Sequence, residues 1–265
     1  MGHQPNISVS KTIFITGAGK GIGAATARLF AKQGWRVGLY DRDKALVEQL
    51  AATLGSNTHA GVLDVADTSQ WESALSDFHL WAGRLDVLLN NAGILFSGPF
   101  ENTPINDHIR LLNVNVLGVI AGCHAALPYL KQTAGSRVIN MSSASAIYGQ
   151  ADLANYSATK FAVRGLTEAL DVEWQRHGIR VLDIMPMFVN TDRVTDMKTK
   201  SIKKLGVALA ATDVSQVIWQ AATTATRSAK THWTVGLQAR MMFKAAGLTP
   251  EWLLQLINSR IANHN

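Results

Sequence analysis

Short runs of apolar and β-branched residues alternate with longer stretches of helical periodicity along the chain. The apolar runs predict seven strands, near residues 12–16, 36–41, 59–64, 85–90, 137–142, 180–185 and 232–235. The periodic stretches predict helices near residues 21–33, 43–54, 68–82, 104–130, 155–177 and 213–228, and a last one near 250–262. After the sixth strand, residues 187–211 are expected to form a long irregular or helical segment.

The alternation of strands and helices predicts an α/β fold with a single doubly wound parallel sheet of about seven strands. Strands such as "TIFIT" and "DVLLN" are apolar at successive positions, as a sheet covered by helices on both faces requires. With no linker-like stretch in 265 residues, we expect one domain over residues 1–265. Residues 187–211 would cover the substrate, and residues 237–265 would form a C-terminal helical extension.

The composition and charge of the chain argue against several classes of function. The formal charge of +6 is mild, and its one local excess, "KTKSIKK" at residues 198–204, lacks the interleaved aromatics of a nucleic-acid groove. The single cysteine, Cys123, allows no internal disulfide, and Cys123 and His124 lack partners for a metal site. No apolar run reaches about 18 residues, so we expect no membrane span and a cytoplasmic location.

A dense glycine run, "TGAGKGIG" at residues 16–23, follows the first strand and opens the first helix. Glycine loses much entropy on folding, so such a run indicates a backbone that approaches a ligand closely. Helix N-termini hold phosphates, so the ligand expected is a nucleotide pyrophosphate. The spacing differs from a P-loop, because Gly21 follows Lys20, and from G-x-G-x-x-G, because Ile22 takes the third glycine position. The alternative is a turn that only packs a helix on a strand.

Further motifs follow later strands. The second strand ends at Asp41, 18 residues beyond Gly23, where a carboxylate can accept both ribose hydroxyls of an adenosine. The fourth strand ends in "NNAG" (residues 90–93), and "YSATK" places Tyr156 and Lys160 four residues apart. With these motifs, in this order, the chain resembles the short-chain dehydrogenase/reductase family over residues 11–236.

The resemblance implies a Rossmann-like fold and an NAD(P)-dependent oxidoreductase that interconverts secondary alcohols and ketones. It implies catalytic roles for Asn115, Ser143, Tyr156 and Lys160. It implies an adenine contact at Asp64, a brace of the central sheet at Asn90, and contacts to the nicotinamide amide from the segment that begins at Pro186, in which Met187 replaces the usual glycine. The implied cofactor site comprises Thr16, Gly17, Gly19, Lys20, Gly21, Ile22, Gly23, Asp41, Arg42, Asp64, Val65, Asn91, Ala92, Gly93, Tyr156, Lys160, Pro186, Val189 and Thr191.

The chemistry of these residue types agrees with the implied roles. Tyrosine, with a pKa near 10, is a poor base at neutral pH. Lys160 lies one helical turn from Tyr156, and its ammonium lowers the tyrosine's pKa by favouring the phenolate. Ser143 can hydrogen-bond the substrate oxygen, while Asn115 can anchor a water that relays protons past Lys160.

The sequence leaves more than one possibility for the cofactor and for the assembly. Asp41 repels a 2′-phosphate and favours NAD, whereas Arg42 and Lys20 are basic residues of the kind that suit NADP. The family resemblance implies a homo-oligomer, a dimer or a tetramer, through the helix at residues 155–177. Two other functions stay open: an NADPH-dependent 3-oxoacyl-(acyl-carrier-protein) reductase, and a non-catalytic protein that senses a dinucleotide.

Apolar residues beyond the strand ends predict a largely apolar small-molecule substrate rather than a sugar, because an apolar wall leaves hydroxyl groups unsatisfied. The alternative is that several of these residues pack inward and leave a smaller, more polar pocket. The expected wall comprises Ile94, Leu95, Phe96, Ala146, Ile147, Tyr148, Leu153, Met187, Phe188, Met197 and Leu205.

Overall fold

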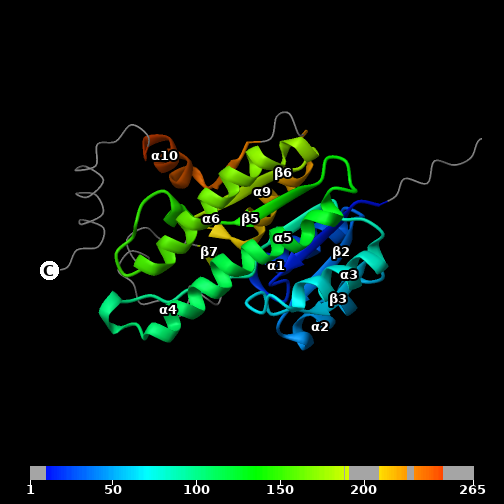
Figure 1. Cartoon of the computed structure of the whole chain (residues 1–265), viewed down its shortest axis with the longest axis horizontal. Helices are drawn as coiled ribbons and strands as arrows, with labels where there is room; N and C mark the ends of the chain where they lie inside the picture. Colours follow the sequence, from blue (N-terminus) through cyan, green and yellow to red (C-terminus); the bar gives the residue numbers. More distant parts are fainter. Residues whose placement is uncertain (1–9, 188, 191–208, 226–229, 247–265) are drawn as a thin grey trace, which may run out of the picture.

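The computed structural model describes residues 10–187, 189–190, 209–225 and 230–246. A parallel sheet forms its centre, with helices packed around it (Figure 1). It has seven strands, in the order β3-β2-β1-β4-β5-β6-β9. All seven predicted strands are found, and the predicted doubly wound α/β fold is confirmed. The strands are β1 (Thr12–Thr16), β2 (Arg36–Asp41), β3 (Thr58–Val62), β4 (Val87–Asn90), β5 (Arg137–Met141), β6 (Arg180–Pro186) and β9 (His232–Val235).

Helices cover both faces of the sheet. Side chains of α1 (Gly21–Lys32), α2 (Lys44–Leu54) and α9 (Ala211–Thr223) share one hydrophobic core with the strands. Those of α3 (Gln70–Ala82), α5 (Gly118–Leu130) and α6 (Ala154–Glu173) share the core on the opposite face. Helix α4 (Ile105–Leu112) leads into α5, and α10 (Leu237–Ala246) follows β9. The central strands are therefore apolar at successive positions because each of their faces meets a helix layer.

The second core is organised by aromatic rings. Phe14 of β1 stacks on Tyr40 of β2 with 4.1 Å between ring centroids, and meets Phe78 of α3 edge-on at 5.4 Å. All three side chains are almost fully buried. Offset stacks and edge contacts of this kind add stability beyond the burial of area, so they fix α3 against the strands that precede the site.

Several predicted boundaries differ from the structure. The helix predicted over residues 104–130 is divided by a π-helical turn (Asn113–Leu117), and the helix predicted to reach residue 228 ends at Thr223. A short parallel pair, β7 (Val189–Asn190) with β8 (Leu209–Ala210), and helix α10 within the C-terminal extension were not located from the sequence. The helix predicted near 250–262 and most of the segment 187–211 lie outside the described residues.

One helical run satisfies the length and composition expected of a membrane span. Residues Ile105–Leu130 have a mean hydropathy of 1.5 in their most apolar window, of which 39% is buried. Helices in the core of non-membrane proteins pass the same test, and α5 contributes to the core beside α3, so this run is weak evidence for a span.

Candidate active site

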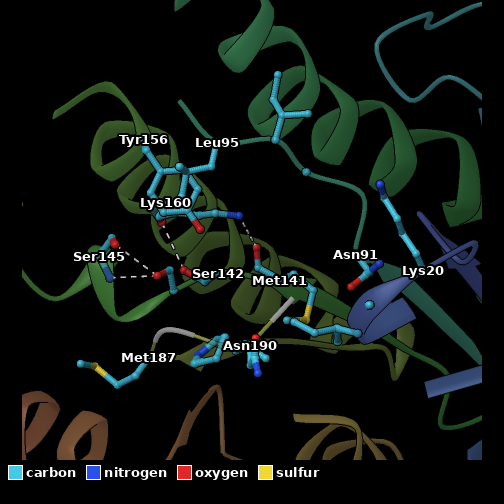
Figure 2. Close-up of a pocket in the computed structure, with 17 residues that line it drawn as sticks. Lys20, Asn91, Leu95, Met141, Ser142, Ser145, Tyr156, Lys160, Met187 and Asn190 are labelled. Carbon is cyan, nitrogen blue, oxygen red and sulfur yellow. Dashed lines mark hydrogen bonds between the residues drawn. The ribbon is translucent and has the colours of Figure 1, made fainter. Parts of the chain in front are cut away.

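The chain reverses the order of its strands at the centre of the sheet, because β1 lies between β2 and β4. Ligands of doubly wound proteins bind outside the carboxyl ends of the strands at such a point. Here a cavity of about 260 Å³ joins the turn after β1 to the segments after β4, β5 and β6 and to the start of α6 (Figure 2). Its lining includes Lys20, Gly21, Ile22, Asn91, Gly93, Ile94, Leu95, Ser143, Tyr156, Lys160, Pro186, Met187 and Val189.

The glycine turn approaches neighbouring backbone as closely as glycines allow. A Cβ on Gly17 would lie 2.9 Å from the Cα of Ala92, and one on Gly23 would overlap the carbonyl oxygen of Gly17. Gly17 and Gly21 also have φ of +64° and +57°, which side chains disfavour. The turn therefore presents bare backbone and the N-terminus of α1 to the cavity, and this cradle fits the pyrophosphate of a dinucleotide.

Thr16 and Asn91 fix this turn through hydrogen bonds. The Thr16 hydroxyl accepts from the backbone N–H groups of Asn91 and Ala92, each at 3.0 Å. The Asn91 amide donates to the carbonyl oxygens of Thr16 (2.9 Å) and Gly17 (3.0 Å). The "NNAG" motif thus fixes the glycine turn to the end of β4.

The other Asn of that motif braces the sheet, as predicted. Asn90 donates to the Oδ1 of Asn140 on β5 at 2.9 Å and to the Sγ of Cys123 on α5 at 3.6 Å. The Asn140 amide in turn donates to Thr167 of α6 at 3.0 Å. This buried row ties β4 to β5 and α6, the elements that carry the other half of the site.

Asp41 lies at the end of β2 and is already engaged by backbone. Its two carboxylate oxygens accept from the N–H groups of Gly19 and Asp43, both at 3.1 Å. Arg42 is exposed, and Lys20 is exposed at the cavity mouth. The carboxylate therefore fixes the glycine turn as well as offering charge at the place expected for a ribose.

Asp64 and Val65, two residues expected to contact the cofactor, follow β3. Asp64 lies two residues beyond the strand, and its carboxylate accepts from the N–H of Ala66 at 3.0 Å. Val65 is buried against Gly118 and does not line the cavity. Trp71 donates to the backbone carbonyl of Val65 at 3.2 Å.

Tyr156 and Lys160 lie in the first two turns of α6 and face the cavity (Figure 2). The Lys160 ammonium is 5.4 Å from the centroid of the Tyr156 ring and donates to the carbonyl oxygen of Met141 at 2.8 Å. Its side chain is only 6% exposed. A cation held this close and this far from bulk water stabilises a phenolate.

Asn115 lies in the π-helical turn between α4 and α5. Its amide accepts from the N–H of Ile94 (2.8 Å) and donates to the carbonyl of the same residue (2.9 Å) and to Thr159 (3.3 Å). Such turns often occur at functional sites, and here the turn allows one side chain to hold the segment after β4 against α6.

The predicted apolar wall is only partly present. Ile94, Leu95 and Met187 line the cavity, whereas Ala146 and Ile147 are buried in a cluster with Met185. Phe96 and Leu153 line a second, smaller cavity instead. Tyr148 packs against the cluster of Met185 and its neighbours. Phe188, Thr191, Met197 and Leu205 lie outside the described residues.

Sequence reasoning missed a polar group behind Ser143. Ser145 also lines the cavity, and Gln150, 5% exposed, accepts a hydrogen bond from its hydroxyl at 3.0 Å. The third serine in "NMSSAS" was a usable signal for Ser145, but the position of Gln150 depends on how the loop folds.

A cluster of three ionisable side chains is linked to this loop through Phe243. His232 of β9 contacts Asp183 of β6 at 3.0 Å through Nδ1 and Glu168 of α6 at 3.1 Å through Nε2. Burial disfavours its charged form, but the hydrogen bond and charge of Asp183 outweigh that cost and raise the pKa of His232. Its ring lies 5.4 Å from that of Phe243 of α10, which packs on the cluster of Ala146 and Met185.

Among the described residues, no group of three His, Cys, Asp or Glu side chains has the arrangement of a metal site.

The comparisons with known proteins agree with this geometry. Residues 11–202 match the family model of short chain dehydrogenases. The chain is 37% identical over 184 residues to the meso-2,3-butanediol dehydrogenase of Serratia marcescens, covering 69% of this chain and 73% of that one. It is 34% identical over 212 residues to the 3-alpha-(or 20-beta)-hydroxysteroid dehydrogenase of Mycobacterium bovis, covering 79% and 81%. A 3-ketoacyl-(acyl-carrier-protein) reductase from Brucella melitensis, solved in complex with NADH, superposes with a TM-score of 0.80 at 30% identity, covering 86% and 98%.

Proposed function

Because the chain belongs to the short-chain dehydrogenase family, an oxidoreductase family that uses a nicotinamide cofactor on secondary alcohols and ketones, we propose that Ser143, Tyr156 and Lys160 carry its reaction. The observation that carries the proposal is the single cavity in which these three side chains meet the glycine turn. A nicotinamide bound there supplies or accepts the hydride.

The residues then divide the proton chemistry. For an alcohol, the Tyr156 phenolate takes the hydroxyl proton as the hydride leaves the carbon; for a ketone, the Tyr156 hydroxyl returns it. Lys160 stabilises the phenolate by its charge, 5.4 Å from the ring centroid. Ser143 hydrogen-bonds the substrate oxygen. Asn115 holds the backbone of Ile94 at the cavity wall. We also propose that Asn115 anchors a water that relays protons.

We favour NAD over NADP as the cofactor. The Asp41 carboxylate is fixed at the end of β2 by two backbone N–H groups, so it cannot swing away from an incoming 2′-phosphate without breaking them. Arg42, which would pair with that phosphate, is exposed and free to turn to solvent. In direct competition, NAD(H) should therefore give the higher kcat/KM.

The substrate is proposed to be a small, largely apolar secondary alcohol or ketone. Ile94, Leu95 and Met187 contribute to the apolar part of the wall, while Ser143 and Tyr156 offer polar groups to one oxygen. The likeness to a 3-ketoacyl-(acyl-carrier-protein) reductase favours one competing substrate class, a carrier-bound 3-oxoacyl thioester. Comparing kcat/KM for apolar ketones, polyhydroxylated ketones of similar size and a 3-oxoacyl thioester decides among the three.

The test of the catalytic assignment is Tyr156→Phe. We expect kcat to fall at least about 10²-fold, the lower end for general acid–base catalysis, with the Kd for NADH unchanged. A variant that keeps most of its turnover would show that another group moves the proton. Ser143→Ala tests the contact to the substrate oxygen in the same assay.

Assembly and location complete the proposal. Large apolar side chains are exposed along α4, the π-helical turn, α5 and α6, among them Ile109, Leu112, Leu117, Ile120 and Phe161. We propose that a second copy of the chain covers them in a homo-oligomer, a dimer or a tetramer, which light scattering would measure. A cytoplasmic location is also part of the proposal, because a single buried cysteine suits a reducing compartment.

A further inference from the structure

A row of polar side chains leads from Ser143 into the protein. The Ser143 hydroxyl donates to the Ser145 hydroxyl at 3.2 Å and accepts from the backbone N–H of Ser145 at 3.1 Å (Figure 2). The Ser145 hydroxyl donates to Oε1 of Gln150 at 3.0 Å, and Nε2 of Gln150 donates to the Tyr148 hydroxyl at 3.0 Å. The row thus starts at the cavity and ends at a half-buried ring.

The amide of Gln150 sets the direction of the row. A carboxamide oxygen can only accept, so the one proton of Ser145 is committed to Gln150. Ser145 then meets Ser143 only as an acceptor through its oxygen, while its N–H occupies one lone pair of Ser143. Ser145 is 2% exposed and Gln150 5% exposed, so water competes little for these bonds. The Ser143 hydroxyl is consequently held as a donor.

The backbone of Gln150 contacts the start of α6, the helix that carries Tyr156. Its N–H donates to the Ser157 hydroxyl at 3.1 Å, and its carbonyl accepts from the N–H of Leu153 at 3.2 Å. Ser157 follows Tyr156 on the first turn of α6 and is buried. One residue therefore contacts the partner of Ser143 through its side chain and the neighbour of Tyr156 through its main chain.

We propose that Gln150 is a positioning residue for the reaction: through Ser145 it commits the Ser143 hydroxyl to donate to the substrate oxygen. The inference rests on the proposed function, since it takes Ser143 as the group that meets that oxygen. When a ketone enters, Ser143 turns its proton from Ser145 to the carbonyl oxygen, and Ser145 keeps its bond to Gln150. The donor strengthens as charge builds on that oxygen, so the effect belongs to kcat rather than to cofactor binding.

The test compares two substitutions of similar length in the full-length protein. Both substitutions lose the donor to the Tyr148 hydroxyl, but they differ toward Ser145: Gln150→Met removes the acceptor, whereas Gln150→Glu keeps an acceptor oxygen. We expect Gln150→Met to lower kcat for ketone reduction roughly tenfold, the worth of one hydrogen bond, and Gln150→Glu to stay within about threefold of the parent. The Kd for NADH should not change in either. Equal losses in both variants, or no loss in Gln150→Met, would overturn the proposal.

A second variant guards against a general disturbance of the loop. Ser145→Ala breaks the same row at its middle but leaves the N–H that Ser143 accepts. It should lower kcat by a similar factor, and the double variant Ser145→Ala/Gln150→Met should lose no more than either single one. Multiplied losses would mean that Gln150 acts through the fold or through Tyr156 and would refute the positioning role. If Ser143→Ala leaves ketone reduction intact, the catalytic assignment of Ser143 fails instead.

Discussion

Two loops at the same edge of the sheet are built by opposite means. The turn after β1, residues 16–23, is shaped by missing side chains, since a Cβ on Gly17 or Gly23 would meet backbone atoms. The loop after β5, residues 142–150, is shaped by the side chains it has, through hydrogen bonds of Ser143, Ser145 and Gln150.

The difference corresponds to what each loop would hold. A pyrophosphate is bound by backbone N–H groups, so the first turn needs close approach and tolerates little added volume. A reacting oxygen needs one donor aimed in one direction, so the second loop needs a particular pattern of donors and acceptors. Substitutions that add volume should therefore disable the first loop, and substitutions of similar size that remove a hydrogen-bonding group should impair the second.

The largest effect expected from this comparison is that of Gly23→Ala. The added methyl overlaps the Gly17 carbonyl oxygen, so the turn must move, and a displacement of about 1 Å at a positioned group can cost roughly 10²-fold. We expect kcat/KM for the cofactor to fall at least that far. Steady-state kinetics and NADH titration measure it.

Gly149→Ala is the matched control in the second loop. A Cβ there meets no atom within 4 Å, and the φ of Gly149 is not positive. Its kinetics should stay within about twofold of the parent, because the loop owes its shape to polar contacts elsewhere. Equal damage from both substitutions would erase the distinction between the two loops.

A smaller effect is expected at Asp41, where charge and hydrogen bonding are separable. Asp41→Asn keeps an acceptor for the Gly19 N–H but removes the negative charge, whereas Asp41→Ala removes both. Both should improve the use of NADP(H) relative to NAD(H) about tenfold or more, and only Asp41→Ala should also weaken binding of both cofactors. A parent enzyme that already prefers NADPH would show that Lys20 and Arg42 decide instead.

The smallest effect expected is a pH dependence of the protein's stability that arises from His232. The pKa of His232 is raised in the folded protein, since Asp183 and Glu168 favour its charged form more than burial and Arg164 oppose it. A raised pKa means that the folded state holds the proton more tightly. The stabilisation is complete below the usual pKa of 6.5 and is lost as the pH rises through the folded value.

His232→Asn, which keeps a donor toward Asp183 but cannot take up a proton, isolates this contribution. The parent should exceed the variant in Tm by a few degrees near pH 6, and the difference should shrink toward about pH 9. Differential scanning fluorimetry across that range measures it. A difference that grows with pH would contradict the assignment of the charge to His232.

Most of the fold was predictable because its signals are local. The central strands are recognisable by consecutive apolar residues, and the glycine turn, "NNAG" and "YSATK" by their fixed spacings. The strand order then brought these motifs to one cavity, as the switch between β1 and β4 requires. The π-helical turn around Asn115 carries no comparable signal, because it differs from an α-helix only in its hydrogen bonding.

The substrate side was harder to predict because it depends on side-chain direction. Ala146, Ile147 and Leu153 are apolar and follow a strand, as Ile94 and Leu95 do, yet they pack inward. The inward fold of the chain after β5 also buries Gln150 beside Ser145. Neither outcome follows from the hydropathy of these positions. Gln150 is placed by bonds to Ser145 and Ser157 that depend on how the loop folds, and the cluster of Ala146 and Ile147 packs on α10, which is remote in sequence.

The lone sulfhydryl of the chain has a practical consequence. Cys123 is 2% exposed beneath Asn90, and burial raises the pKa of its thiol to about 12, although the bond from Asn90 opposes this. The thiolate is the form that attacks alkylating reagents, so the folded protein should resist them. The Cys123 thiol then reacts only when α5 separates locally from β4. The rate of its labelling therefore measures how often this local opening occurs.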